Sequence, residues 1–130
     1  MKTARHLLLT LSLAVLALPL ACHNRSSSSG SLRVTLSVSP DHPRMTKPIN
    51  LQVHVDNPQG EPVNDARVTG ELTMKLMDMG TTKLTFAPKG NGDYEAQVKS
   101  VDMSGPWSLA VNAKRGGAEA KQTFDVNVFD

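Results

Sequence analysis

Apolar residues recur at every second position in seven separate segments, and this alternation constrains the fold more than any other feature. The segments begin at Leu32, Ile49, Val68, Leu84, Tyr94, Trp107 and Phe124. Successive side chains of a β-strand point to opposite faces, so a period of two indicates strands with one buried face. Stretches rich in Pro, Gly, Asn and Asp separate the segments, as is typical of turns. We expect the third strand to run inward through Leu72, Met74 and Leu76.

The alternating segments lie between residues 32 and 130, a length that suits one domain with one core. No stretch of this range has the period of a long amphipathic helix. Short antiparallel strands in this number, over about 100 residues, fit a known type of sandwich. The sequence therefore predicts an all-β, seven-stranded antiparallel immunoglobulin-like β-sandwich, as a single domain after a signal peptide.

The N-terminus has the charge and hydropathy of an export signal. Lys2 and Arg5 precede an apolar run over residues 7–20, which is too short for a comfortable membrane span. The only cysteine, Cys22, closes this run, where a bacterial lipoprotein carries the cysteine that is acylated and becomes the new N-terminus. The segment LPLAC resembles a lipobox. A secreted protein with a stray thiol and an uncleaved anchor are the alternatives.

We therefore expect a lipoprotein signal peptide over residues 1–21, an acylated Cys22 with a Ser-rich tether over 22–31, and the domain over 32–130. Acyl chains such as palmitate would hold the domain on a membrane. His23 follows the cysteine in place of the aspartate associated with inner-membrane retention. The prediction is a protein of the cell envelope that faces the periplasm, on the outer membrane rather than the inner one.

The net charge argues against nucleic acid as a partner. All 12 acidic residues follow Cys22, whereas two of the 14 basic residues leave with the signal, so the mature chain carries 12 − 12 = 0. A neutral chain with one Trp, one Tyr and no basic cluster lacks the surface that nucleic-acid binding needs. We also find no nucleophile with a base and acid, no phosphate loop and no haem motif, so we expect no enzyme.

Four stretches of the predicted domain carry a family resemblance. These are DNPQGEPVNDARV, MKLMDMG, GDYEAQV and DMSGPWSLAV. In this order and spacing they resemble the YtkA-like domain, a family of small bacterial envelope β-sandwich domains related to FixH proteins. The resemblance covers roughly residues 34–128 and implies an envelope accessory role. FixH relatives are associated with the assembly of copper-containing respiratory oxidases.

The methionines outside the core are predicted to gather at one end of the sandwich. Successive antiparallel strands alternate in direction, so the first, third and fifth connections emerge at one end. These connections carry His42, Met45, Met77, Met79 and Met103. Thioethers are soft neutral ligands that select Cu(I), so Met77, Met79 and Met103 form a candidate Cu(I) site, completed by Met45 or His42. Apolar capping of the sandwich end is the structural alternative for the methionines, and simple solvation is that for His42.

Three other residues are assigned structural roles. Met74 and Trp107 follow the inward parity of their strands, so we expect both in the core. Tyr94 in GNGDYEA resembles the Gly-x-Tyr of a tyrosine corner and is given no chemistry. Two functions stay open: an envelope lipoprotein that binds or hands on Cu(I) through a Met-rich end, and a non-metal protein-interaction module of an envelope or membrane complex.

Overall fold

The computed structural model describes residues 31–130, and this part of the chain is all-β. The strands are β1 (Arg33–Ser39), β2 (Ile49–Asp56), β3 (Arg67–Met74), β4 (Thr81–Gly90), β5 (Asp93–Val98), β6 (Gly105–Arg115) and β7 (Ala118–Val128). The prediction of seven antiparallel strands is confirmed. The predicted signal peptide, Cys22 and most of the tether lie outside the described residues. No helix long and apolar enough to cross a membrane occurs between residues 31 and 130.

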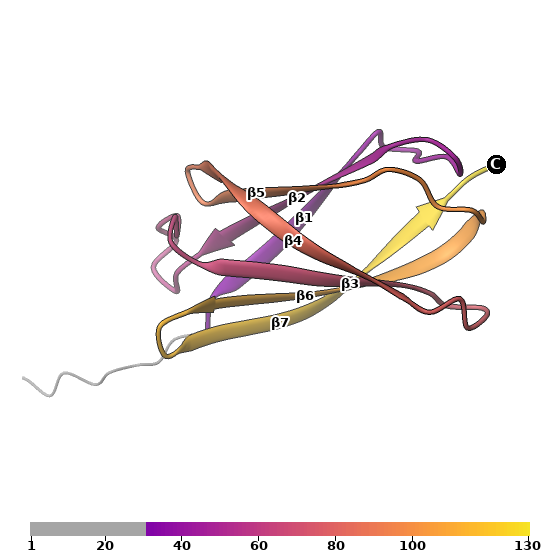
Figure 1. The fold of residues 1–130 in the computed structure, drawn as a ribbon. Coiled ribbons are helices and arrows are strands. Elements are labelled where there is room, and N and C mark those ends of the chain that lie inside the picture. The colour runs from indigo at the N-terminus through magenta and orange to yellow at the C-terminus, as the bar shows by residue number, and fades with distance from the viewer. Residues whose placement is uncertain (1–30) are drawn as a thin grey trace, which may run out of the picture.

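The strands are hydrogen-bonded in the order β1-β2-β5-β4-β3-β6-β7 and fold into a nearly closed sandwich. Figure 1 shows β1, β2 and β5 in one layer and β3, β6 and β7 in the other. The fourth strand, β4, joins the layers, because its residues 81–86 pair with β3 and its residues 87–90 pair with β5. A register shift between Pro88 and Gly90 marks the bend of this strand.

The core consists of the inward side chains of the two layers. Val53, Val55 and Leu109 are fully buried, and the buried side chains in the described residues are apolar apart from the Tyr94 hydroxyl and the Trp107 indole N–H. Gly70 takes an inward position on β3 because the ring of Phe86 lies over it. A Cβ atom there would come within 2.9 Å of the Phe86 ring, so no larger residue fits without displacement.

The connections divide between two ends of the sandwich (Figure 1). The methionine end comprises residues 40–48, 75–80 and 99–104 together with the C-terminal residues 129 and 130. The polar end comprises residues 57–66, 91–92 and 116–117. The first strand starts at the polar end, so a tether preceding it would attach there.

The third strand, β3, ends earlier than the alternation predicts. Strand β3 ends at Met74, the chain bends over residues 75–77, and Leu76 is 73 % exposed. The prediction that Leu76 faces the core is therefore wrong. Asp78 accepts a hydrogen bond from the backbone N–H of Gly80, which has φ 77°, so a tight turn replaces the strand at this point.

Candidate functional site

Backbone hydrogen bonds join the segments of the methionine end to one another or to the adjoining strand. The N–H of Met45 donates to the carbonyl of Phe129 at 2.8 Å, and the N–H of Thr46 donates to the carbonyl of Val101 at 2.9 Å. The N–H of Lys75 donates to the carbonyl of Pro106 at 3.0 Å. Segments far apart in the sequence are thus held side by side by main-chain groups.

The segment Met103-Ser104-Gly105-Pro106-Trp107 forms the turn into β6. The Trp107 ring is buried, and its Nε1–H donates to the carbonyl of Met103 at 3.1 Å. Gly105 has φ 122°, a conformation that favours glycine, and a Cβ atom there would lie 3.0 Å from Cε of Met74. Met74 itself is 5 % exposed and pairs across the sheet with Trp107. This turn therefore needs glycine for both its backbone and its packing.

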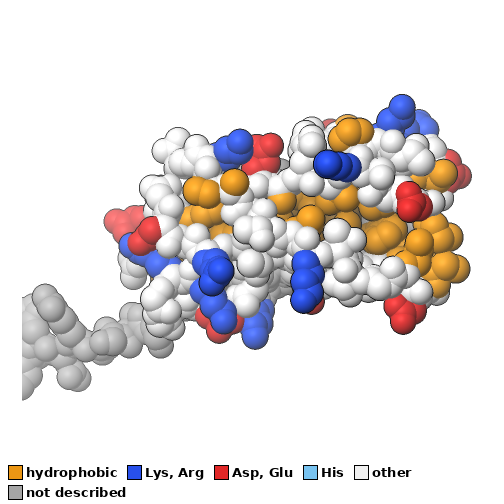
Figure 2. Space-filling model, in the orientation of Figure 1, with side chains coloured by type: hydrophobic (Ala, Val, Ile, Leu, Met, Phe, Trp, Pro, Cys, Tyr) orange, Lys and Arg blue, Asp and Glu red, His pale blue; other side chains and the backbone are white. Residues whose placement is uncertain are grey.

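Two of the predicted ligands lie on the surface. Met77 is 50 % exposed and Met79 is 43 % exposed, both in the connection between β3 and β4. Leu76 beside them and Phe129 after β7, which is 45 % exposed, complete the set of large apolar side chains exposed in the described residues. Figure 2 shows hydrophobic side chains gathered at the right-hand end, where these segments lie in Figure 1. We call Leu76, Met77, Met79 and Phe129 the exposed apolar surface.

The other predicted ligands have different surroundings. Met45 and Met103 are half-buried and pack against the hydrophobic core. The exposed His42 ring lies against that of Phe129, with ring centroids 5.4 Å apart and planes tilted by 48°. The structure thus separates the predicted set into two thioethers in solvent, two packed on the core, and an imidazole beside an aromatic ring.

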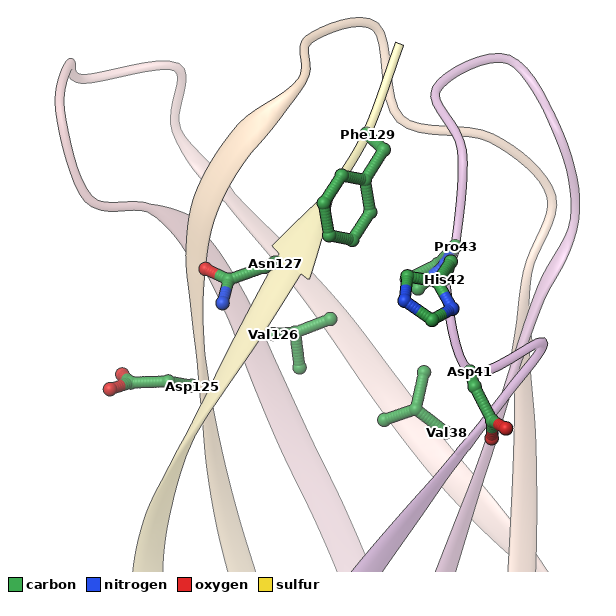
Figure 3. Close-up of a pocket in the computed structure, with 8 residues that line it drawn as sticks. All are labelled: Val38, Asp41, His42, Pro43, Asp125, Val126, Asn127 and Phe129. Carbon is green, nitrogen blue, oxygen red and sulfur yellow. The ribbon is translucent and has the colours of Figure 1, made fainter.

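His42 and Phe129 line a hollow of about 260 Å³ between the ends of β1 and β7. The remaining lining residues are Val38, Asp41, Pro43, Asp125, Val126 and Asn127. Figure 3 shows the carboxylates of Asp41 and Asp125 pointing to opposite sides of the hollow. Asp125 is also paired with Lys75, its Oδ1 lying 2.9 Å from Nζ. The hollow therefore does not bring two acids onto one ligand.

Harder metal ligands do not converge either. Among the described residues there is no group of three or more His, Cys, Asp or Glu side chains arranged to hold a metal ion. The thioethers are a separate class of ligand, and Met77 and Met79 are the two that solvent reaches most readily.

The polar end carries an ionic cluster that the sequence did not reveal. Nδ1 of His54 lies 2.6 Å from Oδ1 of Asp93, and Nε2 lies 2.9 Å from Oδ1 of Asp56. The hydrogen bond to Asp93 raises the pKa of His54 above its ordinary value, partial burial opposes this rise, and Asp56 adds to it. The two nitrogens face different carboxylates, so the imidazole ties β2 to the start of β5.

Tyr94 fixes the connection between β2 and β3. Its hydroxyl is buried, donates to the carbonyl of Val63 at 2.7 Å and accepts from the N–H of Ala66 at 2.9 Å. Nearby, the side chain of Asn64 accepts from the N–H of Gly92 at 2.7 Å. A tyrosine corner bonds its own upstream chain within a few residues, whereas Tyr94 reaches 31 positions back.

Two features of the candidate site differ from what the alternation predicts. The pattern predicts an inward Leu76, which is exposed, and it assigns no role to Phe129. The exposure of Phe129 could have been predicted from the alternation in β7. Val126 and Val128 point inward, so the next residue points outward. No comparable signal indicates the partners of His54, since β2 and β5 are paired without being consecutive.

Comparison with known families shows to which family this domain belongs. The YtkA-like family model matches residues 26–112. The chain belongs to the YtkA-like family. The match includes the Met-rich connection and the turn at residues 103–107, both quoted for the resemblance, and ends before β7. A search of curated proteins found no match.

Solved structures with a similar fold are segments of larger proteins. A cell-surface chitinase, ChiW from Paenibacillus sp. str. FPU-7, is 19 % identical with a TM-score of 0.55, over 79 % of this chain and 9 % of that one. An engineered protein is 19 % identical with a TM-score of 0.49, over 74 % and 20 %. A β-glucuronidase from Parabacteroides merdae is 11 % identical with a TM-score of 0.46, over 75 % and 14 %. The chain spans a fifth or less of these structures, and the likeness to the chitinase concerns the fold alone.

Proposed function

We propose that this protein is an envelope lipoprotein whose YtkA-like domain binds Cu(I) at the methionine end and hands it on. The observation that carries the proposal is the exposure of Met77 and Met79, two thioethers separated by one residue, at the end opposite the start of β1. Thioethers prefer Cu(I) and need no deprotonation. They therefore suit an oxidising compartment, where thiolates tend to be lost to disulfides.

The arrangement favours weak and exchangeable binding. Met77 and Met79 belong to a surface connection. Met103 and Met45, which pack on the core, are the predicted ligands that would complete the set. An exposed pair of ligands leaves coordination positions open to a second protein. Such a site can pass on its metal, whereas a closed cage with four protein ligands would retain it.

Cu(I) titration under reducing conditions tests the metal. We expect stoichiometric binding by the wild type, measured by competition with a coloured Cu(I) chelator. The variant Met77→Leu/Met79→Leu should lose it, because leucine keeps the apolar volume and removes both sulfur ligands. Leu76→Ser is the matched control, since it alters the same connection without touching a thioether. Absence of binding by the wild type, or equal binding by the wild type and the double leucine variant, would exclude the copper role.

A non-metal docking module is the second candidate, and one observation favours it. Leu76 and Phe129 are exposed to 73 % and 45 % and contain no metal-binding atom. Large apolar side chains exposed at one end of a domain are a feature of contact surfaces. Under this hypothesis Leu76→Ser with Phe129→Ser should abolish the species that cross-link to the protein in intact cells. Met77→Leu/Met79→Leu should retain these cross-linked species. Each hypothesis therefore predicts a loss in a different double variant.

The lipid anchor is tested at Cys22. Wild type should remain in the membrane fraction, and its N-terminal peptide should carry the mass of acyl chains. Cys22→Ser should yield an unlipidated protein that is released without them. Equal release of the two proteins, with no lipid mass on the wild type, would contradict the anchor.

A further inference from the structure

Exposure separates the methionines of the described residues into distinct classes. Met77 and Met79 are 50 % and 43 % exposed, Met45 and Met103 are half-buried, and Met74 is 5 % exposed. We propose that Met77 and Met79 form an oxidation site, which takes up oxygen from hydrogen peroxide or related two-electron oxidants while the fold shields Met74. The selectivity comes from the structure, because all these side chains contain the same thioether group.

The reaction is an oxygen transfer that balances without a further reagent. A sulfur lone pair attacks one oxygen of hydrogen peroxide, an S–O bond forms and the O–O bond breaks. The departing hydroxide takes the proton from the S–OH group and leaves as water, so the thioether is oxidised to a sulfoxide and peroxide is reduced. Methionine sulfoxide reductases reverse the change, so the site can cycle between two chemical states.

The position of the two methionines makes this change tolerable for the fold. They lie beyond the end of β3, in a connection whose turn is held by Asp78 and Gly80 rather than by the thioethers. At its start, Lys75 is fixed by its backbone bond to Pro106 and its ion pair with Asp125. A sulfoxide at Met74 would instead place a polar oxygen beside Trp107 in the core. Oxidation at Met77 and Met79 therefore alters the surface and leaves the sandwich intact.

Oxidation also changes what the methionine end can bind, and this step rests on the proposed Cu(I) function. A sulfoxide presents oxygen, a hard donor, in place of the soft sulfur that Cu(I) prefers. It also adds a dipole to the exposed apolar surface, which weakens an apolar contact. The oxidised protein should release Cu(I), and reduction should restore binding.

Limited peroxide treatment tests the oxidation site by itself. Tryptic cleavage at Arg67, Lys75 and Lys83 places Met74 in peptide 68–75 and both exposed methionines in peptide 76–83. In the folded purified protein, each methionine of 76–83 should gain oxygen at least about tenfold faster than Met74, which corresponds to about 1.4 kcal/mol. In denaturant the rates should become similar. Equal rates in the folded protein would overturn the proposal.

A second measurement separates this proposal from the proposed function. Protein oxidised at Met77 and Met79, and the same protein after treatment with methionine sulfoxide reductases, are titrated with Cu(I). Loss and recovery of binding support the coupling, and unchanged binding after oxidation overturns it. Selective oxidation with no Cu(I) binding in any state would uphold the oxidation site and refute the copper function. Met77→Leu/Met79→Leu should gain no oxygen in peptide 76–83.

Discussion

The two ends of this sandwich differ in the side chains that they expose. At the polar end, side chains hold the connections: His54 bridges Asp56 and Asp93, and the Tyr94 hydroxyl holds the backbone of the connection between β2 and β3. At the methionine end, backbone bonds such as that between Met45 and Phe129 act together with side-chain ties such as the Lys75–Asp125 ion pair. These ties do not use the side chains of Met77 and Met79, which are exposed at this end.

The difference between the two ends concerns exposed side chains that do not stabilise the fold. Polar side chains that satisfy one another at the polar end leave few groups to engage a ligand. The apolar groups exposed at the methionine end gain nothing for the fold, because a large hydrophobic side chain in water gives up the stabilisation that burial would supply. Their concentration there is consistent with the proposed binding function.

The largest expected effect lies beneath the methionine end, at Trp107. Trp107→Ala should lower the free energy of unfolding by about 3–5 kcal/mol, because a buried ring is lost and a cavity remains. The Nε1–H bond to Met103 is lost with it, which should loosen the turn at residues 103–107. Denaturant unfolding followed by circular dichroism measures the change. A loss below about 1 kcal/mol would show that this end has no rigid core under its surface.

At the polar end, the Tyr94 hydroxyl is expected to add to stability beyond the packing of its buried ring. Tyr94→Phe keeps the ring and leaves the carbonyl of Val63 and the N–H of Ala66 without their partner. Unsatisfied buried groups cost about 1–3 kcal/mol, so we expect a loss of that size in urea unfolding. Amide hydrogen exchange should quicken at Ala66 and not at Met45. If Tyr94→Phe left the free energy of unfolding unchanged, the polar end would not depend on the hydrogen bonds of this side chain.

The sequence predicted the strands well and the ends of the strands poorly. Alternation locates all seven strands because each has one buried face. The same rule failed at Leu76, since an apolar residue in a loop continues the pattern after the strand has ended at Met74. The alternation shows only which residues are apolar. The position at which the backbone leaves the sheet determines which of them are buried.

The candidate site was predictable in position but not in its contacts. Met77 and Met79 lie outside the core as predicted, but the reason is that β3 ends at Met74 and not their parity, since Leu76 on the inward parity is also exposed. The half-burial of Met45 and Met103 could not be predicted, because it depends on how two loops pack on the core. The pairing of His54 with Asp93, 39 residues away, depends on register between strands that are not consecutive.

A smaller, pH-dependent effect is expected at His54. Its pKa is raised in the folded state, so the stabilisation is fully present below the ordinary value of about 6.5 and is lost as pH rises through the folded pKa. The difference in unfolding free energy between wild type and His54→Gln should therefore shrink as the pH rises above about 6.5. It should stay below about 1 kcal/mol, because the side chain is 37 % exposed. A difference that grows with pH would contradict the ion pairs, and Asp93→Asn should remove most of the pH dependence.

The smallest effect should come from Leu76, and its comparison with Leu72 isolates the role of the exposed surface. Leu72 is 3 % exposed on β3, and Leu76 is 73 % exposed four positions later. Leu72→Ala should cost about 2–5 kcal/mol, as expected for a buried leucine. Leu76→Ala should change the free energy of unfolding by less than about 0.5 kcal/mol, because almost no buried area is lost. Parallel denaturant titrations of the two variants make the comparison. If Leu76→Ala also lost several kcal/mol, the methionine end would be part of the core, and its apolar side chains would need no binding function to explain them.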